Sequence, residues 1–248
     1  MFGTNTMTPH THADGAEKGK LPETAQRFVN FLFLKVGPAF RTLQSNEKLV
    51  AKAEFLDSFD RYHGKTVVLS YSLVGLRADC DLLLWRIDPN LDTFQAVSER
   101  LLTTGIGKYL TPVYSFLAST KPPESHGKQL LVEPAGDPGM PGKFKYVFVH
   151  PLVKSRNWYN LPAAERSGIL EDQARIRARF PGVKLHTAYS FGLDEQEFMM
   201  AFESDKPDDF LELAAELRES GWGAYTLRDT PTFTCVAKDL REILDGLG

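Results

Sequence analysis

An internal repeat restricts the fold of this chain more than any other feature. The segment YSLVGLRADCDLLLWRI, which begins at Tyr71, resembles YSFGLDEQEFMMAFES, which begins at Tyr189, at an offset of about 117 residues. Downstream, residues 91–116 match residues 207–233, and Gly105, Gly107 and Tyr109 fall on Gly221, Gly223 and Tyr225 at an offset of 116. Because the spacing is kept across both blocks, the chain is predicted to be a tandem duplication.

Each half shows the same order of elements: strand, helix, strand, strand, helix, strand. Apolar runs bounded by turn residues predict the strands, and amphipathic stretches predict the helices. In the first half we expect strands at 27–36, 65–75, 80–87 and 113–120, and helices at 46–62 and 92–104. In the second half we expect strands at 143–152, 183–192, 198–204 and 232–238, and helices at 162–180 and 207–220. This order is typical of the ferredoxin-like βαββαβ unit, so the prediction is an α+β fold in which two such repeats form a dimeric α+β barrel within one chain.

Composition shifts divide the chain into four segments. We expect a disordered leader at 1–24, an N-terminal repeat at 25–118, a connector rich in proline and glycine at 119–143, and a C-terminal repeat at 144–241. The leader carries His10 and His12 as an H-x-H pair, which is more typical of a solvated tail than of a metal site. A connector of this length is usually mobile or functional.

The overall charge excludes one class of protein. The sequence has 29 Lys+Arg against 32 Asp+Glu, a formal net charge of −3 and 42% apolar side chains, so it lacks the basic surface of a nucleic-acid-binding protein. No apolar run is long enough to span a membrane. Cys80 and Cys235 lie in apolar strand-like runs and are expected to be reduced core residues. These features predict a cytoplasmic protein without a membrane partner.

The usual catalytic motifs are missing, so any chemistry has to come from scattered residues or a cofactor. On the predicted helix 162–180, Ile169, Gln173, Ile176 and Phe180 share one face. Gln173 is therefore a carboxamide on an apolar stripe, and burying it without a partner costs a few kcal/mol. Its partner is a strand backbone, a water molecule or a ligand.

Two histidines and a basic aromatic cluster are the other candidates. His186 lies in a strand on the face opposite Leu185, and a lone strand histidine is more often a hydrogen-bonded core or surface group than a ligand. His150 precedes Pro151 in an apolar strand and points either into the barrel or to solvent. The basic aromatic cluster comprises Lys154, Arg156, Trp158 and Tyr159. It suits a flat anionic ligand, and a solvated loop anchored by one tryptophan is equally compatible with its spacing.

Four segments together resemble a known family. They are VGLRADCDLLLWRI, GKYLTPVYSFLA, HPLVKSRNWYNLPAAER and AYSFGLDEQEF, in this order. They are similar to the chlorite dismutase-like superfamily, and in particular to its coprohaem decarboxylase branch, over about residues 25–240. The resemblance implies a homopentamer that binds haem b or coprohaem, an iron porphyrin, between the sheet and helices of the C-terminal half. It also implies a peroxide-linked oxidoreductase, with coprohaem decarboxylation as the leading specific activity.

The resemblance also assigns residues. Lys154 corresponds to a partner of a porphyrin propionate, Trp158 to a residue packed beside the pocket, and Tyr114 to a tyrosine that contacts a propionate. His150 stands where the decarboxylases have the radical-forming tyrosine. His150 and His186 are accordingly the candidate catalytic residues.

The position of the iron ligand departs from the family pattern. Gln173 occupies the place of the proximal histidine, and a neutral carboxamide is a weak iron ligand compared with imidazole. Counting 13 residues from Gln173 places His186 at the distal position, whereas counting back from Gly192 places Leu185 there. Both residues are candidates at this point.

Three functions are consistent with these residues. The chain can bind iron porphyrin with His186, His150 or water as axial ligand and carry out peroxide-linked chemistry. It can be a porphyrin-binding pseudoenzyme or carrier that lacks a strong iron ligand. It can also be a pentameric scaffold without a cofactor.

Overall fold

The structure, a computed structural model, describes residues 27–62, 66–120 and 140–248. The predicted leader at 1–24 and most of the connector at 119–143 lie outside the described residues. The N-terminal half contains β1 (Phe28–Val36), α1 (Pro38–Arg41), α2 (Ser45–Asp60), β2 (Val67–Ser72), β3 (Leu82–Asp88), α3 (Leu91–Leu102), the 3-10 helix η1 (Gly105–Tyr109) and β4 (Leu110–Ser119). The C-terminal half contains β5 (Tyr146–Lys154), α4 (Arg156–Asn160), α5 (Ala163–Ala178), β6 (Lys184–Tyr189), β7 (Phe198–Ser204), α6 (Pro207–Glu219), α7 (Gly221–Ala224), β8 (Thr226–Arg228), β9 (Phe233–Ala237) and α8 (Leu240–Gly246).

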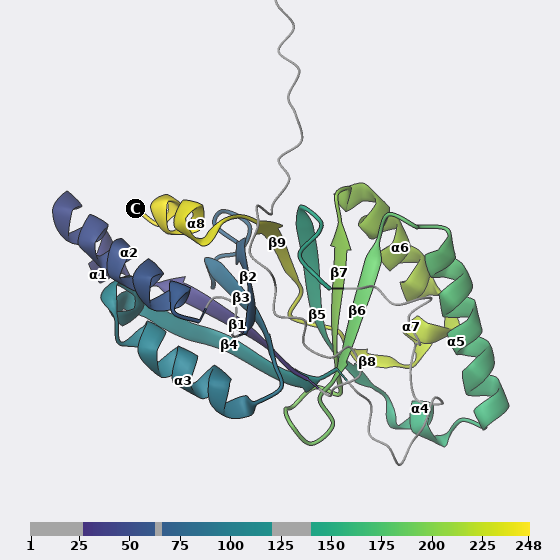
Figure 1. The fold of residues 1–248 in the computed structure, drawn as a ribbon. Helices are drawn as coiled ribbons and strands as arrows, with labels where there is room; N and C mark the ends of the chain where they lie inside the picture. Colours follow the sequence, from purple (N-terminus) through teal and green to yellow (C-terminus); the bar gives the residue numbers. More distant parts are fainter. Residues whose placement is uncertain (1–26, 63–65, 121–139) are drawn as a thin grey trace, which may run out of the picture.

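The predicted α+β duplication is confirmed. In each half, antiparallel strands carry helices on their outer side, and the two sheets meet in the middle of the molecule (Figure 1). The strand order is β7-β6-β4-β1-β3-β2-β9-β5-β8, and β5 also pairs with β7, which closes the sheet into a barrel. The two halves are joined at two places in the barrel: β2 of the first half pairs with β9 of the second, and β4 of the first half pairs with β6 of the second.

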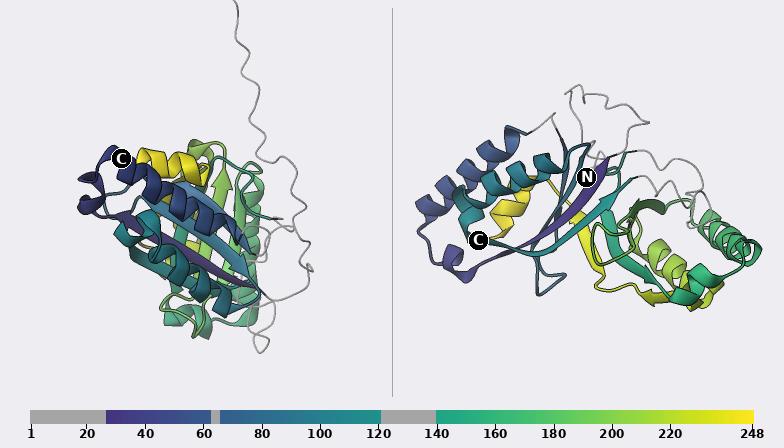
Figure 2. Two further views of the ribbon diagram at one scale, coloured as in Figure 1. Left: turned by 60° about the vertical axis from the view of Figure 1, so that its left-hand side comes forward. Right: turned by 90° about the horizontal axis from the view of Figure 1, so that it is seen from below.

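Three apolar clusters follow from this closure. The barrel interior holds one cluster drawn from both halves, which includes Phe33, Trp85 and Phe233. A second cluster lies beneath α2 and α3, and a third beneath α5 and α6. Strands β3 and β7 are buried along their whole length because both of their faces meet a cluster. The two outer layers of helices are seen from two further directions in Figure 2.

The C-terminal end of the chain returns to the N-terminal half. Helix α8 was not predicted from the sequence; it lies beside α2 (Figure 1) and contributes Leu240, Ile243 and Leu244 to the second cluster. Cys80 and Cys235 are both buried and free, as predicted. Among the helices in the described ranges, none is long and apolar enough to cross a membrane.

The aligned glycines of the repeat have a packing explanation. A Cβ atom added at Gly107 would lie 1.7 Å from the carbonyl oxygen of Leu101, and one added at Gly223 would lie 2.1 Å from that of Arg218. At each place the chain turns tightly back onto the end of the preceding helix, α3 or α6. Only glycine permits that approach, so the duplicated glycines preserve the same turn in both halves.

Candidate functional site

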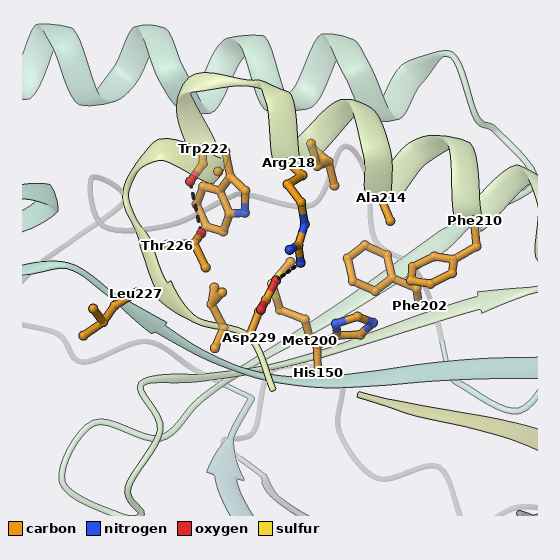
Figure 3. A pocket seen from close by; sticks show the side chains of 13 residues that line it. His150, Met200, Phe202, Phe210, Ala214, Arg218, Trp222, Thr226, Leu227 and Asp229 are labelled. Atoms are coloured by element: carbon orange, nitrogen blue, oxygen red, sulfur yellow. Dashed lines mark hydrogen bonds and ion pairs between the residues drawn. The ribbon is translucent and has the colours of Figure 1, made fainter. Parts of the chain in front are cut away.

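The outer face of the C-terminal sheet carries a cavity of about 280 Å³. It lies between α6 and strands β5 and β7, and the start of β8 closes one side (Figure 3). Its wall is mainly aromatic and aliphatic, with a few polar side chains. The residues that define it best are His150, Met200, Phe202, Phe210, Trp222 and Arg218.

His150 points from β5 into this cavity (Figure 3). The ladder between β5 and β9 ends at Val149, whereas the ladder between β5 and β7 continues and pairs His150 with Met200. Nε2 of His150 is buried and has no hydrogen-bond partner among the described residues. Burial lowers the pKa of His150 to about 4, against smaller raising effects from Asp229. The side chain is therefore a neutral imidazole with an unused nitrogen.

Aromatic rings hold the His150 imidazole in place. The Phe202 ring lies 5.8 Å away and the Phe210 ring 5.6 Å away, both edge-to-face. Phe210 also stacks on Phe148 at 3.9 Å. These contacts restrict rotation of the imidazole.

An ion pair at the edge of the cavity was not found from the sequence. Arg218 extends from the last turn of α6 and donates to Asp229 Oδ2 at 2.6 Å (Figure 3). Arg218 is largely exposed, so the pair contributes little to stability. In the sequence, Arg218 is one of several charged residues of an amphipathic helix. Its side chain lies at the cavity because it pairs with Asp229, which follows β8. No local pattern in the sequence marks this pair.

Gln173 lies on α5, which packs on α6 and α7, and it is not among the residues that line the cavity. The helix follows Pro162, has Glu165 in its first turn and Arg175 and Arg177 in its last turn, which suits the helix dipole. The side chain of Gln173 is 0% exposed, and neither its Oε1 nor its Nε2 has a hydrogen-bond partner in the described part of the chain. The sequence allowed a strand backbone, a water molecule or a ligand as the hydrogen-bond partner of Gln173, and the strand backbone is thus excluded.

Strand β6 separates the two candidates for the distal position. Leu185 belongs to the cluster beneath α5 and α6 and therefore faces the helices. Thr187 lies on the same face, and its buried Oγ1 also has no partner among the residues that the structure describes. His186 faces the barrel interior, where Nε2 lies 2.9 Å from Glu203 Oε2 and the ring is 5.5 Å from Trp85. Only Leu185 can therefore contact a group bound beneath the helices, and His186 lies away from that place.

Lys154 is buried behind the cavity wall. Its Nζ donates to the Trp222 carbonyl at 2.8 Å and to Thr226 Oγ1 at 3.1 Å, and both of these residues line the cavity. The Trp222 ring lies 3.2 Å from Nζ and attracts the charged form of the amine. Burial nevertheless lowers the pKa of Lys154 to about 6. A carboxylate reaches Nζ only through its remaining N–H or by replacing one of these bonds.

Trp158 is fully buried on α4, next to Lys154. Its ring meets the Trp222 ring edge-to-face at 5.6 Å, and its Nε1 has no hydrogen-bond partner within the described ranges. Trp158 therefore supports a residue of the cavity wall and does not line the cavity. The alternative of a solvated loop anchored by one tryptophan does not describe this segment, because Lys154 is buried as well.

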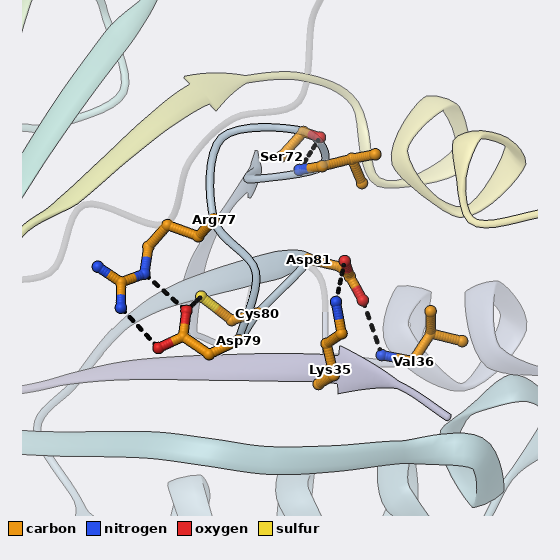
Figure 4. Close-up of polar contacts among 8 residues, drawn as sticks. Lys35, Val36, Ser72, Arg77, Asp79, Cys80 and Asp81 are labelled. Carbon is orange, nitrogen blue, oxygen red and sulfur yellow. Dashed lines mark hydrogen bonds and ion pairs between the residues drawn. The ribbon is translucent and has the colours of Figure 1, made fainter. Parts of the chain in front are cut away.

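Tyr114 lies elsewhere, on the barrel side of β4. Its hydroxyl donates to Asp79 Oδ2 at 2.9 Å, and its ring packs on Phe233 at 5.1 Å. Asp79 also accepts two hydrogen bonds from Arg77, which hold the pKa of that carboxyl well below its usual range (Figure 4). The structure therefore does not bring Tyr114 to the cavity that His150 lines. Across the described ranges, no group of three or more His, Cys, Asp or Glu side chains is arranged to hold a metal ion by itself.

Comparisons with known proteins agree with this architecture. Residues 47–238 match the family model described as chlorite dismutase. The chain belongs to the chlorite dismutase family. It is 32% identical over 165 residues to the coproheme decarboxylase of Mycolicibacterium smegmatis, across 66% of this chain and 70% of that protein.

Solved structures of the chlorite dismutase family share the fold. A mutant chlorite dismutase from Candidatus Nitrospira defluvii superposes with a TM-score of 0.79 at 24% identity, covering 89% of this chain and 95% of that chain. A heme-binding protein from Thermus thermophilus superposes with a TM-score of 0.75 at 24% identity, covering 89% and 94%. The predicted family and the duplicated fold are thus confirmed.

Proposed function

We propose that this chain binds an iron porphyrin, haem b or coprohaem, beneath α5 and α6 and acts as a haem-dependent oxidoreductase. The observation that carries the proposal is the buried amide of Gln173, whose two polar atoms have no partner among the described residues. Leaving such a group unpaired costs roughly 1–3 kcal/mol. A ligand with a polar centre and an apolar surround offsets that cost, and the position corresponds to the iron ligand of the family.

The surrounding residues fit a flat, mostly apolar ligand. Leu185, Met200 and Phe202 present apolar surface on the strand side, and Thr187 adds a second polar group that finds no partner in the described part of the chain. The cavity of about 280 Å³ is slightly smaller than ordinary ligand pockets of roughly 300–1,000 Å³. Entry of a porphyrin therefore requires aromatic side chains of the wall to change rotamer.

Two further residues have roles toward the ligand in this proposal. Lys154 turns its remaining N–H toward a propionate, which restores the charged form of the amine. Trp158 holds Trp222 against the ligand. Tyr114, bonded to Asp79 on the barrel side, takes no part in the proposed site.

The bound iron porphyrin would supply the redox chemistry with peroxide. Two residues of this chain limit the rate of that chemistry. Leu185 provides no hydrogen-bond donor for an oxidant. Gln173 is a weak donor to iron in comparison with imidazole. These two features favour a slow enzyme and, as a second candidate, a porphyrin-binding pseudoenzyme or carrier.

Coprohaem decarboxylation is expected to be slow or absent, because His150 stands where the decarboxylases have the radical-forming tyrosine. The measurement is chromatography of the porphyrins after incubation of the full-length protein with coprohaem and peroxide. Rapid formation of haem b would contradict the expectation and would assign decarboxylation to this chain.

Absorption spectra after addition of haem and, separately, of coprohaem test the proposed function itself. Uptake with a Soret band supports it, and peroxide-dependent turnover of the complex separates the enzyme from the carrier. No uptake of either compound would leave the cofactor-free scaffold as the function. Sedimentation of the same samples tests the pentamer, which stays a prediction from the resemblance.

A further inference from the structure

The unused nitrogen of His150 is a potential ligand atom at the cavity wall. Its lone pair is available, because burial keeps the imidazole neutral at pH 7. No protein group in the described ranges bonds to Nε2, which is unusual for a buried polar atom. A neutral imidazole in this state is ready to bind a metal.

Aromatic packing fixes the direction of this imidazole. The Phe202 and Phe210 rings lie edge-to-face against it at 5.8 Å and 5.6 Å, and the ring points from β5 into the cavity (Figure 3). A side chain whose rotation is restricted in this way keeps its ligand atom in place before a metal binds.

Other side chains are poorer ligands for iron in this place. His186, the other histidine in the described ranges, is bonded to Glu203 on the barrel side. Gln173 offers only an amide oxygen. Met200, which pairs with His150 across β5 and β7, offers a thioether of weaker donor strength.

We propose that, in the porphyrin complex proposed above, Nε2 of His150 binds the iron, so that the axial ligand comes from β5 and not from α5. The inference rests on the proposed function, since it needs a porphyrin in the site. It accounts for a family member that has glutamine at the usual ligand position and a histidine, held between the Phe202 and Phe210 rings, on a strand.

Resonance Raman and absorption spectra of the complex with haem test this assignment in the full-length protein. We expect an iron–imidazole stretching band in the ferrous wild type, its loss in His150→Ala, and its return when free imidazole is added. We also expect His150→Ala to weaken haem binding by about tenfold or more. The variant His186→Ala, which removes an imidazole from the opposite face of the sheet, is expected to leave the band unchanged.

Metal-free protoporphyrin IX separates this inference from the proposed function. Its binding, followed by fluorescence, does not use an iron ligand, so wild type and His150→Ala should bind it equally. If the porphyrin fails to bind to either, the proposed function is wrong. If it binds but the iron–imidazole band persists in His150→Ala, the ligand assignment is wrong and the proposed function stands. Circular dichroism of each variant establishes that it is folded.

Discussion

Buried polar side chains without partners in the described ranges concentrate beneath the helices of the C-terminal half. Gln173, Thr187 and His150 each have a buried polar atom of this kind. In the core of a folded protein such atoms are rare, because each one loses its hydrogen bonds to water without gaining others. His150 points into the cavity and Thr187 lies on the helix-covered face of β6, whereas Gln173 is on α5 and does not line the cavity.

Replacing Gln173 by histidine is expected to strengthen iron binding. Imidazole is a better iron donor than a carboxamide, and position 173 is fully buried on α5, beneath which the porphyrin is proposed to bind. The measurement is titration of the Gln173→His variant and of the wild type with haem. Metal-free protoporphyrin IX is the control, since its affinity should not change. Equal haem affinities would mean that this side chain does not face the metal.

Lys154 is expected to make stability depend on pH above neutrality. Its pKa is about 6 in the folded chain and 10.5 when exposed, so the unfolded chain binds more protons between these values. The free energy of unfolding therefore rises with pH, by at most about 1.4 kcal/mol per pH unit for one group. Urea denaturation at pH 7 and pH 9 should show that the free energy of unfolding rises less with pH in Lys154→Met than in the wild type. The exposed Lys184→Met is the matched control, and equal slopes in wild type and Lys154→Met would contradict the prediction.

The order of helices and strands follows from local patterns, and the repeat allowed each half to be checked against the other. The predicted helix at 162–180 corresponds to α5, and the predicted strand at 198–204 has the bounds of β7. The short elements α4, α7 and β8 have no periodicity to reveal them. The structure alone decided which face of β6 carries Leu185 and which carries His186, because the face depends on pairing with β7.

The turn between α6 and α7 gives a prediction at the level of elements. Gly223→Ala is expected to destabilise the chain by about 1–3 kcal/mol, because the added Cβ would meet the Arg218 carbonyl and overpack the turn. Gly168→Ala in α5 is the control: nothing lies within 4 Å of its added Cβ, and alanine in a helix interior stabilises by roughly 0.5–1 kcal/mol. Thermal unfolding of both variants checks this. A neutral Gly223→Ala would show that the turn can relax.

The barrel joins the two repeats into one molecule. Its interior cluster contains Phe33 and Trp85 from the first half and Val147 and Phe233 from the second. Neither half can bury its inner sheet face without the other. Helix α8 adds a further connection, because it extends the C-terminal half onto the N-terminal helices.

The two repeats are therefore expected to unfold together. Trp85 reports on the N-terminal half, and Trp158 and Trp222 report on the C-terminal half. Denaturation followed by fluorescence of variants that keep tryptophan in only one half, with the others replaced by phenylalanine, should give coincident midpoints. Two separate transitions would show that the repeats are independent domains.

The sequence by itself determined the duplication, the order of the main elements, the α+β class and the family, because these depend on residue spacing along the chain. The tertiary structure decided where the candidate residues lie. It placed Leu185 beneath the helices and His186 in the barrel, gave Lys154 partners from α7 and β8, and left Nε2 of His150 without one in the described ranges. Burial and hydrogen bonding depend on segments that are distant in sequence, and a strand's two faces are assigned only when its neighbours are known.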